Sequence, residues 1–189
     1  GLANGSISTT VTGGTSGFTY LWTPSGQTGA IATSLGAGTY SVLVTDSRGC
    51  TATATGIVLT QPTVVAASIS PVTHVTCFGL SNGSATAVGS GGVPPYTYLW
   101  SPGGQTTATK SGMPAGTYSV IVRDANLCSS TAVVTITQPA VLAATISSST
   151  NINCFNVPTG SATVTRTGGT GPFTYAWSPS GGTGTTATG

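Results

Sequence analysis

Hydrophobic and polar residues alternate along short segments of this chain, and turns rich in Gly and Pro separate the segments. The most regular segment is 117–123, where Tyr118, Val120 and Val122 lie on one face and the residues between them lie on the other. A period of two is that of a β-strand with one face on a core. The same pattern predicts strands at 64–76, 84–88, 96–100, 105–110, 117–123 and 131–137. Six or seven strands in about 77 residues predict an immunoglobulin-like β-sandwich.

The pattern repeats along the chain. An aromatic segment, Tyr96-Thr97-Tyr98-Leu99-Trp100, has counterparts at 18–22 and 173–177, and its Trp recurs after 78 and then 77 residues. Cys50 and Cys128 are 78 residues apart but Gln61 and Gln138 are 77 apart, so the last strand of the first copy has one extra residue, which we expect at Gly56 as a β-bulge. The chain is therefore predicted to be a tandem array with the parts 1–62, 63–139 and 140–189, of which only 63–139 holds the whole unit. Gln-Pro pairs join the parts without a Gly/Ser linker, so we expect a semi-rigid rod.

The aromatic residues are the expected core of each sandwich. Burying a Trp contributes several kcal/mol, which a domain of this size can hardly do without. The alternative is that the Tyr/Trp strand faces solvent and stacks on sugar rings, which would make each unit a carbohydrate-binding module. The expected core aromatics are Tyr20, Trp22, Tyr40, Tyr98, Trp100, Tyr118, Tyr175 and Trp177.

The composition excludes several classes of function. Only 3% of the residues are charged and the net charge is +2, which is too little for a surface that follows nucleic-acid phosphates. No apolar run reaches the ~20 residues of a membrane span. The sole His, His74, has no nucleophile and acid arranged with it in the sequence, so we expect no enzyme and no cofactor. Asp46 and Asp124 occupy equivalent turns, where capping is the simpler role and calcium binding the alternative.

The four cysteines indicate an oxidising compartment if they form disulfides. Counting strand reversals places Cys77 and Cys128 at the same end of one sandwich, so the sequence predicts a disulfide between them. The competing scheme, Cys50–Cys77 with Cys128–Cys154, requires sulfurs two strand lengths apart to meet. Buried free thiols or metal ligands are the remaining alternatives, and metal is disfavoured because no His or carboxylate accompanies the cysteines.

Six motifs follow one another in the complete unit. They are Cys77-Phe78-Gly79, Asn82-Gly83-Ser84-Ala85-Thr86, Gly91-Gly92-Val93-Pro94-Pro95-Tyr96-Thr97-Tyr98-Leu99-Trp100-Ser101, Ala115-Gly116-Thr117-Tyr118, Asp124-Ala125-Asn126-Leu127-Cys128 and Thr135-Ile136-Thr137-Gln138-Pro139. This ordered set resembles the SprB repeat, which occurs in tandem in very large cell-surface adhesins of Bacteroidota. Leu127 departs from the pattern, because the family usually has Gly there. The resemblance covers the whole chain and implies export by the type IX route, outer-membrane attachment, and filaments that serve gliding motility or adhesion, with no catalytic residues.

These expectations combine into one hypothesis of function. The chain is expected to be a structural segment of an extracellular filament or adhesin stalk, and a sugar-binding module is the alternative. The expected partners are further copies of the repeat in the same chain, other rods that associate laterally, and surface polysaccharide. Leu21, Leu43, Leu99 and Ile121 lie opposite the aromatic or Tyr-Val faces and would supply the apolar surface for lateral association.

Overall fold

The computed structural model describes residues 2–155, 157–179 and 181–188. Those residues form strands, turns and loops, with no helix among them. The chain divides into two compact units, Gly1–Thr63 and Val64–Gly189, and each has its own sheets.

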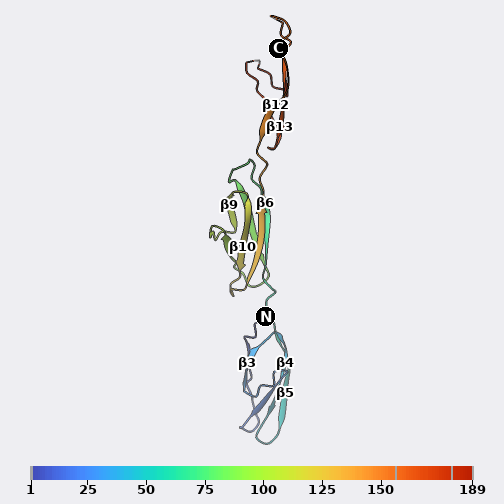
Figure 1. Ribbon diagram of the computed structural model, residues 1–189. Helices are drawn as coiled ribbons and strands as arrows, with labels where there is room; N and C mark the ends of the chain where they lie inside the picture. The colour runs from blue at the N-terminus through green and yellow to red at the C-terminus, as the bar shows by residue number, and fades with distance from the viewer. Residues whose placement is uncertain (1, 156, 180, 189) are drawn as a thin grey trace. The chain divides into compact units, whose positions relative to one another are not determined.

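The second unit contains a complete sandwich of two three-stranded antiparallel sheets (Figure 1). One sheet has the order β6–β7–β9, with β6 at Ala66–Thr73, β7 at Gly83–Ser90 and β9 at Thr109–Met113. The other has the order β11–β10–β8, with β8 at Thr97–Ser101, β10 at Gly116–Arg123 and β11 at Ser129–Ile136. This division of strands matches the A-B-E and C-F-G sheets of an immunoglobulin-like domain.

The fourth strand is the largest departure from the sequence prediction. It was expected at 105–110 but lies at Thr109–Met113, because Gln105 closes the preceding turn by accepting the Trp100 N–H at 2.9 Å. The strand also joins a different sheet from β8. β7 and β10 run in the same direction, because the residues that follow them, Gly92 and Asp124, lie against each other. β8 is antiparallel to β10 and β9 is antiparallel to β7, so β8 and β9 also share one direction and the chain does not reverse between them.

The core of this sandwich lies between the two sheets. Trp100, Tyr118 and Val120 are buried from the β8–β10 side, and Ala85 and Met113 are buried from the opposite sheet. Tyr118 also donates its hydroxyl hydrogen to the carbonyl of Pro114 at 2.9 Å. This bond near the start of β10 corresponds to the tyrosine corner of immunoglobulin-like domains. The core cluster draws only on residues between Ala67 and Ile136, so one repeat contains its own core.

The first unit has the same two-sheet plan, but one of its sheets has two strands instead of three. Its sheets are β1–β3 and β2–β4–β5, and Trp22, Ala32, Leu35, Tyr40 and Val42 form the core. The extra residue of this repeat was expected to form a bulge at Gly56, and that prediction is confirmed: the β4–β5 register shifts there and Gly56 has φ +74°. The strands are β1 (Gly5–Ser8), β2 (Thr19–Thr23), β3 (Ile31–Leu35), β4 (Gly38–Thr45) and β5 (Thr51–Leu59).

The last part of the second unit carries one sheet, β12–β13–β14. Its strands are β12 (Ala143–Thr150), β13 (Ser161–Thr167) and β14 (Thr186–Thr188). The third copy of the aromatic segment, 173–177, was expected to be a strand but is not one. In the complete sandwich the equivalent strand β8 pairs only with β10, and the described residues hold no counterpart of β10 beside 173–177.

Candidate functional site

The described residues hold no cluster with the composition of a catalytic or metal centre. No three His, Cys, Asp or Glu side chains among them lie close enough together to share a metal ion. His74 is exposed, and its Nδ1 accepts the Thr137 N–H at 3.1 Å, just beyond the end of β11. Asp124 precedes the start of β11. The histidine and the acid of this repeat therefore lie at opposite ends of one strand.

The aromatic strand is turned inward where it pairs with a neighbour. Trp22 is 0% exposed and Trp100 is 1% exposed, and their indole N–H groups donate to Gly29 O at 2.8 Å and Thr107 O at 3.0 Å. Tyr40 and Tyr118 are also buried. The other aromatics expected in the core are half-buried: Tyr20, Tyr98, Tyr175 and Trp177. Neither buried indole presents a face on which a sugar could stack.

The most elaborate polar structure is a turn around an aspartate, which we call the aspartate turn (Asp46–Cys50 and Asp124–Cys128). Asp124 is buried, and its Oδ1 accepts the N–H groups of Asn126 at 3.0 Å and Cys128 at 2.8 Å. Its Oδ2 accepts the N–H of Val93 at 2.9 Å, from the loop before β8. Asp46 makes the same three bonds to its own repeat, so the turn is a property of the repeat.

A glycine pair completes the aspartate turn. Gly91 and Gly92 both have positive φ, at +67° and +61°, as do the equivalent pairs Gly13-Gly14 and Gly168-Gly169. A Cβ on Gly92 would collide with the carboxylate of Asp124 and with the side chain of Val65. The sequence showed the glycines and the aspartate as separate loop residues. The bond that joins the two loops, from Val93 N to Asp124, spans 31 residues and has no local sequence signal.

The aspartates therefore act as acceptors for backbone N–H groups. Both Asp124 oxygens are occupied in this way, which is the capping role expected from sequence. The Thr15 and Cys50 N–H groups are the main reason that the pKa of Asp46 lies below its ordinary value. The carboxylates fix the loop before the aromatic strand and do not point into an open cleft.

The lone Lys of the chain lies at the core edge. Lys110 is 8% exposed, and its Nζ donates to Gln105 Oε1 at 3.2 Å and lies 5.8 Å from the ring centroid of Tyr118. Its equivalent in the first repeat, Ala32, is fully buried. A buried Lys can form an isopeptide crosslink when a neighbouring carboxylate promotes the reaction. Both acids of the chain lie in aspartate turns, so Lys110 has no such carboxylate beside it.

The expected Cys77–Cys128 disulfide requires correction. All four cysteines are exposed free thiols. Cys128 immediately precedes β11, whereas Cys77 lies near its far end, where Gly79 N donates to Gln138 Oε1 at 2.9 Å. An eight-residue strand spans roughly 26 Å, far more than the ~5.5 Å between Cα atoms that a disulfide needs. The reversal count failed because it treated β9 as a return along β8.

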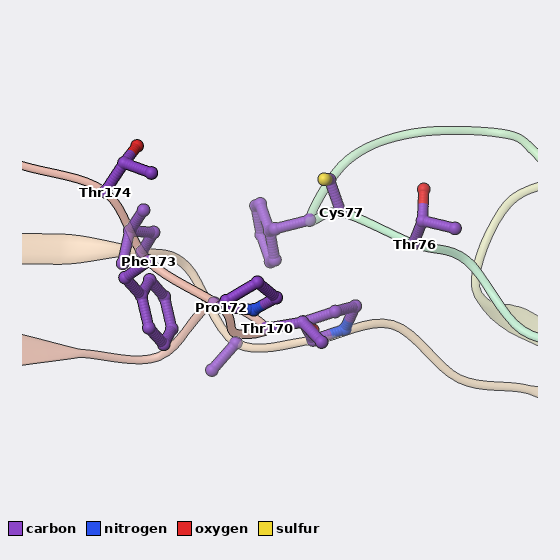
Figure 2. Close-up of a pocket in the computed structure, with 11 residues that line it drawn as sticks. Thr76, Cys77, Thr170, Pro172, Phe173 and Thr174 are labelled. Carbon is purple, nitrogen blue, oxygen red and sulfur yellow. The ribbon is translucent and has the colours of Figure 1, made fainter.

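A cavity of about 270 Å³ lies beside Cys77, between the complete sandwich and the part that follows it in the second unit. Figure 2 shows Cys77 across this cavity from Thr170, Pro172 and Phe173. The segment between the two parts, residues 137–142, is hydrogen-bonded to both of them. Gln138 accepts the Gly79 N–H, and Ala140 O accepts the Gly169 N–H at 2.9 Å. The junction is thus a contact between repeats with no catalytic group in it.

Comparison with protein families agrees with this geometry. The family model described as the SprB repeat matches residues 1–27, 69–105 and 146–184. The chain belongs to the SprB repeat family. The three matches show that copies of the repeat share one chain, and the family indicates a structural, non-enzymatic repeat of a cell-surface, adhesin-like protein. A search of curated proteins found no match.

None of the described part of the SprB-repeat chain forms a helix that is long and apolar enough to cross a membrane.

The backbone conformation of Leu127 provides a direct test of the aspartate turn. It has φ +64°, and the equivalent Gly49 has φ +85°, so the family's usual Gly fits this left-handed position. The Leu conformation costs about 1–2 kcal/mol, and a Gly loses about 0.5–1 kcal/mol more backbone entropy on folding. Because the Leu127 side chain is 77% exposed, little burial is lost on its removal. We expect Leu127→Gly to stabilise its repeat by about 0.5–1 kcal/mol, measured by urea unfolding.

The reciprocal variant provides the control. Gly49→Leu should destabilise the first repeat by a similar amount, because it introduces the same strain. A destabilising Leu127→Gly, or a neutral Gly49→Leu, would contradict the assignment of strain to this position.

The Asp46 carboxylate predicts acid sensitivity of the first repeat. Because its pKa is lowered on folding, the stabilisation is fully present above the unfolded value of about 3.9 and is lost as pH falls through the folded value. We expect urea unfolding of the first repeat, followed with Trp22 as the only tryptophan, to shift to lower urea concentration between pH 5 and the acid limit. Asp46→Asn should be less stable at pH 7 and should lack this shift. An unchanged pH dependence in that variant would rule out Asp46 as its source.

Proposed function

We propose that the chain is a structural repeat segment of an extracellular filament or adhesin stalk. One observation carries the proposal: the linker between successive repeats in the second unit is bonded to both of them, at Gly79–Gln138 and at Ala140–Gly169. A linker fixed on both sides limits bending between repeats, as a spacer under tension requires. The repeat's buried indoles and its aspartates are already bound within its own fold, which leaves few groups for other chemistry.

The specific roles follow from this structural one. The stalk is exported, displayed on the outer surface and attached to the outer membrane, where it serves adhesion or gliding motility. A carbohydrate-binding role for the Tyr/Trp strand finds no support in the position of Trp22 or Trp100, since both indoles are covered by protein.

Surface display is tested on intact cells that produce the protein. An antibody raised against residues 63–139 should label unpermeabilised cells, and electron microscopy with gold-conjugated antibody should show label along thin extracellular filaments. A strain without the gene is the control. Labelling that appears only after permeabilisation would contradict the proposed location, and label confined to the membrane surface would contradict a filament.

Lateral association between rods is the second part of the proposal. Two sheets, β2–β4–β5 and β11–β10–β8, each carry a cross-strand apolar pair on the outer face, Leu21 with Leu43 and Leu99 with Ile121. Leu21 is 47% exposed and Leu99 is 43% exposed, on a chain with very few charges to oppose contact. The pair occurs in both repeats, so each of the two would offer a contact to a neighbouring rod.

Sedimentation velocity tests the association. The parent chain should show a sedimentation coefficient that rises with concentration, and the double variant Leu21→Thr, Leu99→Thr should weaken that rise because Thr keeps the β-propensity of both strands. A parent chain that stays monomeric at millimolar concentration would refute lateral association through these faces.

A further inference from the structure

The two cysteines of a repeat lie at opposite poles of its sandwich. Cys77 lies near the pole where β11 ends and the chain passes to the next repeat, and Cys128 lies at the pole where β11 begins. In a tandem array the first cysteine of one repeat therefore points toward the pole of the following repeat that carries the second cysteine.

The structure shows which loop Cys77 faces. The cavity beside Cys77 is lined by Thr170 and Thr174 of the following repeat (Figure 2). By the 77-residue spacing these residues correspond to Val93 and Thr97 of the complete repeat. The first cysteine thus lies against the part of the next repeat that corresponds to the loop before β8 and to the first residue of β8.

The second cysteine is tied to that same loop. Within the complete repeat Val93 O accepts the Ala125 N–H at 2.8 Å, and Val93 N donates to Asp124 at 2.9 Å. Cys128 closes the same aspartate turn through its own N–H. The first repeat repeats this contact, because Thr15 N donates to Asp46 at 3.0 Å and Cys50 N donates to the same carboxylate at 2.8 Å. The first cysteine of one repeat and the second cysteine of the next are therefore both placed beside the loop that precedes the aromatic segment.

From this convergence we propose that a disulfide joins the first cysteine of each repeat to the second cysteine of the next repeat. Two thiols lose two protons and two electrons as the S–S bond forms, and the disulfide of an oxidised dithiol carrier accepts the electrons by thiol–disulfide exchange. The inference rests on the proposed extracellular location, because that is where such bonds persist. The printed sequence contains no pair of this kind, which agrees with its four free thiols.

Such bonds would give the stalk strength along its length. Each bond reaches from one repeat into the next, so successive bonds overlap along the chain. A pulling force would then have to break sulfur–sulfur bonds before it could fully extend any complete repeat. Both thiols are exposed at the repeat ends, where an oxidant can reach them.

The test completes the third repeat of this chain. A copy of residues 113–139 is added after Gly189, which aligns with Gly112, so the added segment supplies the counterparts of β10 and β11 and one further cysteine. Oxidised glutathione is the oxidant, unreacted thiols are alkylated, and peptide mass spectrometry locates the bond. Because the test is done in solution, its outcome does not depend on where the cell displays the protein.

The expected result is a fall from five thiols to three, with one bond between Cys77 and the added copy of Cys128. Cys77→Ser should abolish the bond, and the matched variant Cys154→Ser should leave it intact. A bond between Cys154 and the added cysteine would overturn the proposal, since it would lie within one repeat. So would five free thiols in a chain whose circular dichroism and tryptophan emission show it to be folded.

A second measurement uses the 189-residue chain, so that the proposal can be tested even if the extended chain does not fold. Thr170→Cys is introduced with Cys50, Cys128 and Cys154 replaced by Ser, and a short bismaleimide is added. We expect crosslinking within one chain between position 170 and Cys77, and none in the matched variant with Thr163→Cys on β13. Equal crosslinking from both positions, or none from either, would contradict the juxtaposition.

Discussion

The pairing of β8 with β10 is the interaction on which the sandwich depends. Five consecutive residue pairs, from Ser101–Ser119 to Thr97–Arg123, fix β8 beside β10 and place Trp100 between the sheets. The third copy of the aromatic segment supplies a comparison within the chain. It has nearly the same sequence but no such strand beside it among the described residues; it forms no strand, and Trp177 is only half-buried. Aromatic alternation alone is therefore insufficient, and the neighbouring strand makes the core.

Much of the fold could be predicted from local pattern. The segment 117–123 became β10 almost residue for residue, and the Gly56 bulge followed from a one-residue difference between copies. The tandem organisation and the family both followed from the recurrence of the aromatic segment. Each of these features has a signal within a few residues or in a fixed period, which a sequence displays directly.

The errors arose where the answer depended on which sheet a strand joins. Periodicity shows that a segment is extended but does not show its neighbour. The sequence predicts a strand that returns beside β8 after Trp100, whereas β9 pairs with β7 in the opposite sheet. That single misassignment moved Cys128 to the wrong pole and produced the predicted disulfide. The contact between Gly92 and Asp124 was missed for the same reason, because it joins loops that are distant in sequence.

The functional argument follows from how the few polar and aromatic groups are used. Each aspartate holds the loop before an aromatic strand, and each buried indole donates to a backbone carbonyl of its own repeat. The aspartates and buried indoles of such a repeat bond within the repeat itself, which leaves its two ends to contact neighbouring repeats. Such a module fits the structural stalk proposed above, and in the second unit the linker is bonded to both of the repeats that it joins.

Acrylamide quenching of tryptophan fluorescence tests the inward orientation of the aromatic strand most directly. Two variants are compared, each retaining a single tryptophan, either Trp100 or Trp177, with Phe at the other two positions. The account predicts that Trp100 is strongly protected in the folded chain and that Trp177 is quenched more readily, with both alike in urea. Quenching of Trp100 in the folded chain at the rate of the unfolded chain would contradict it.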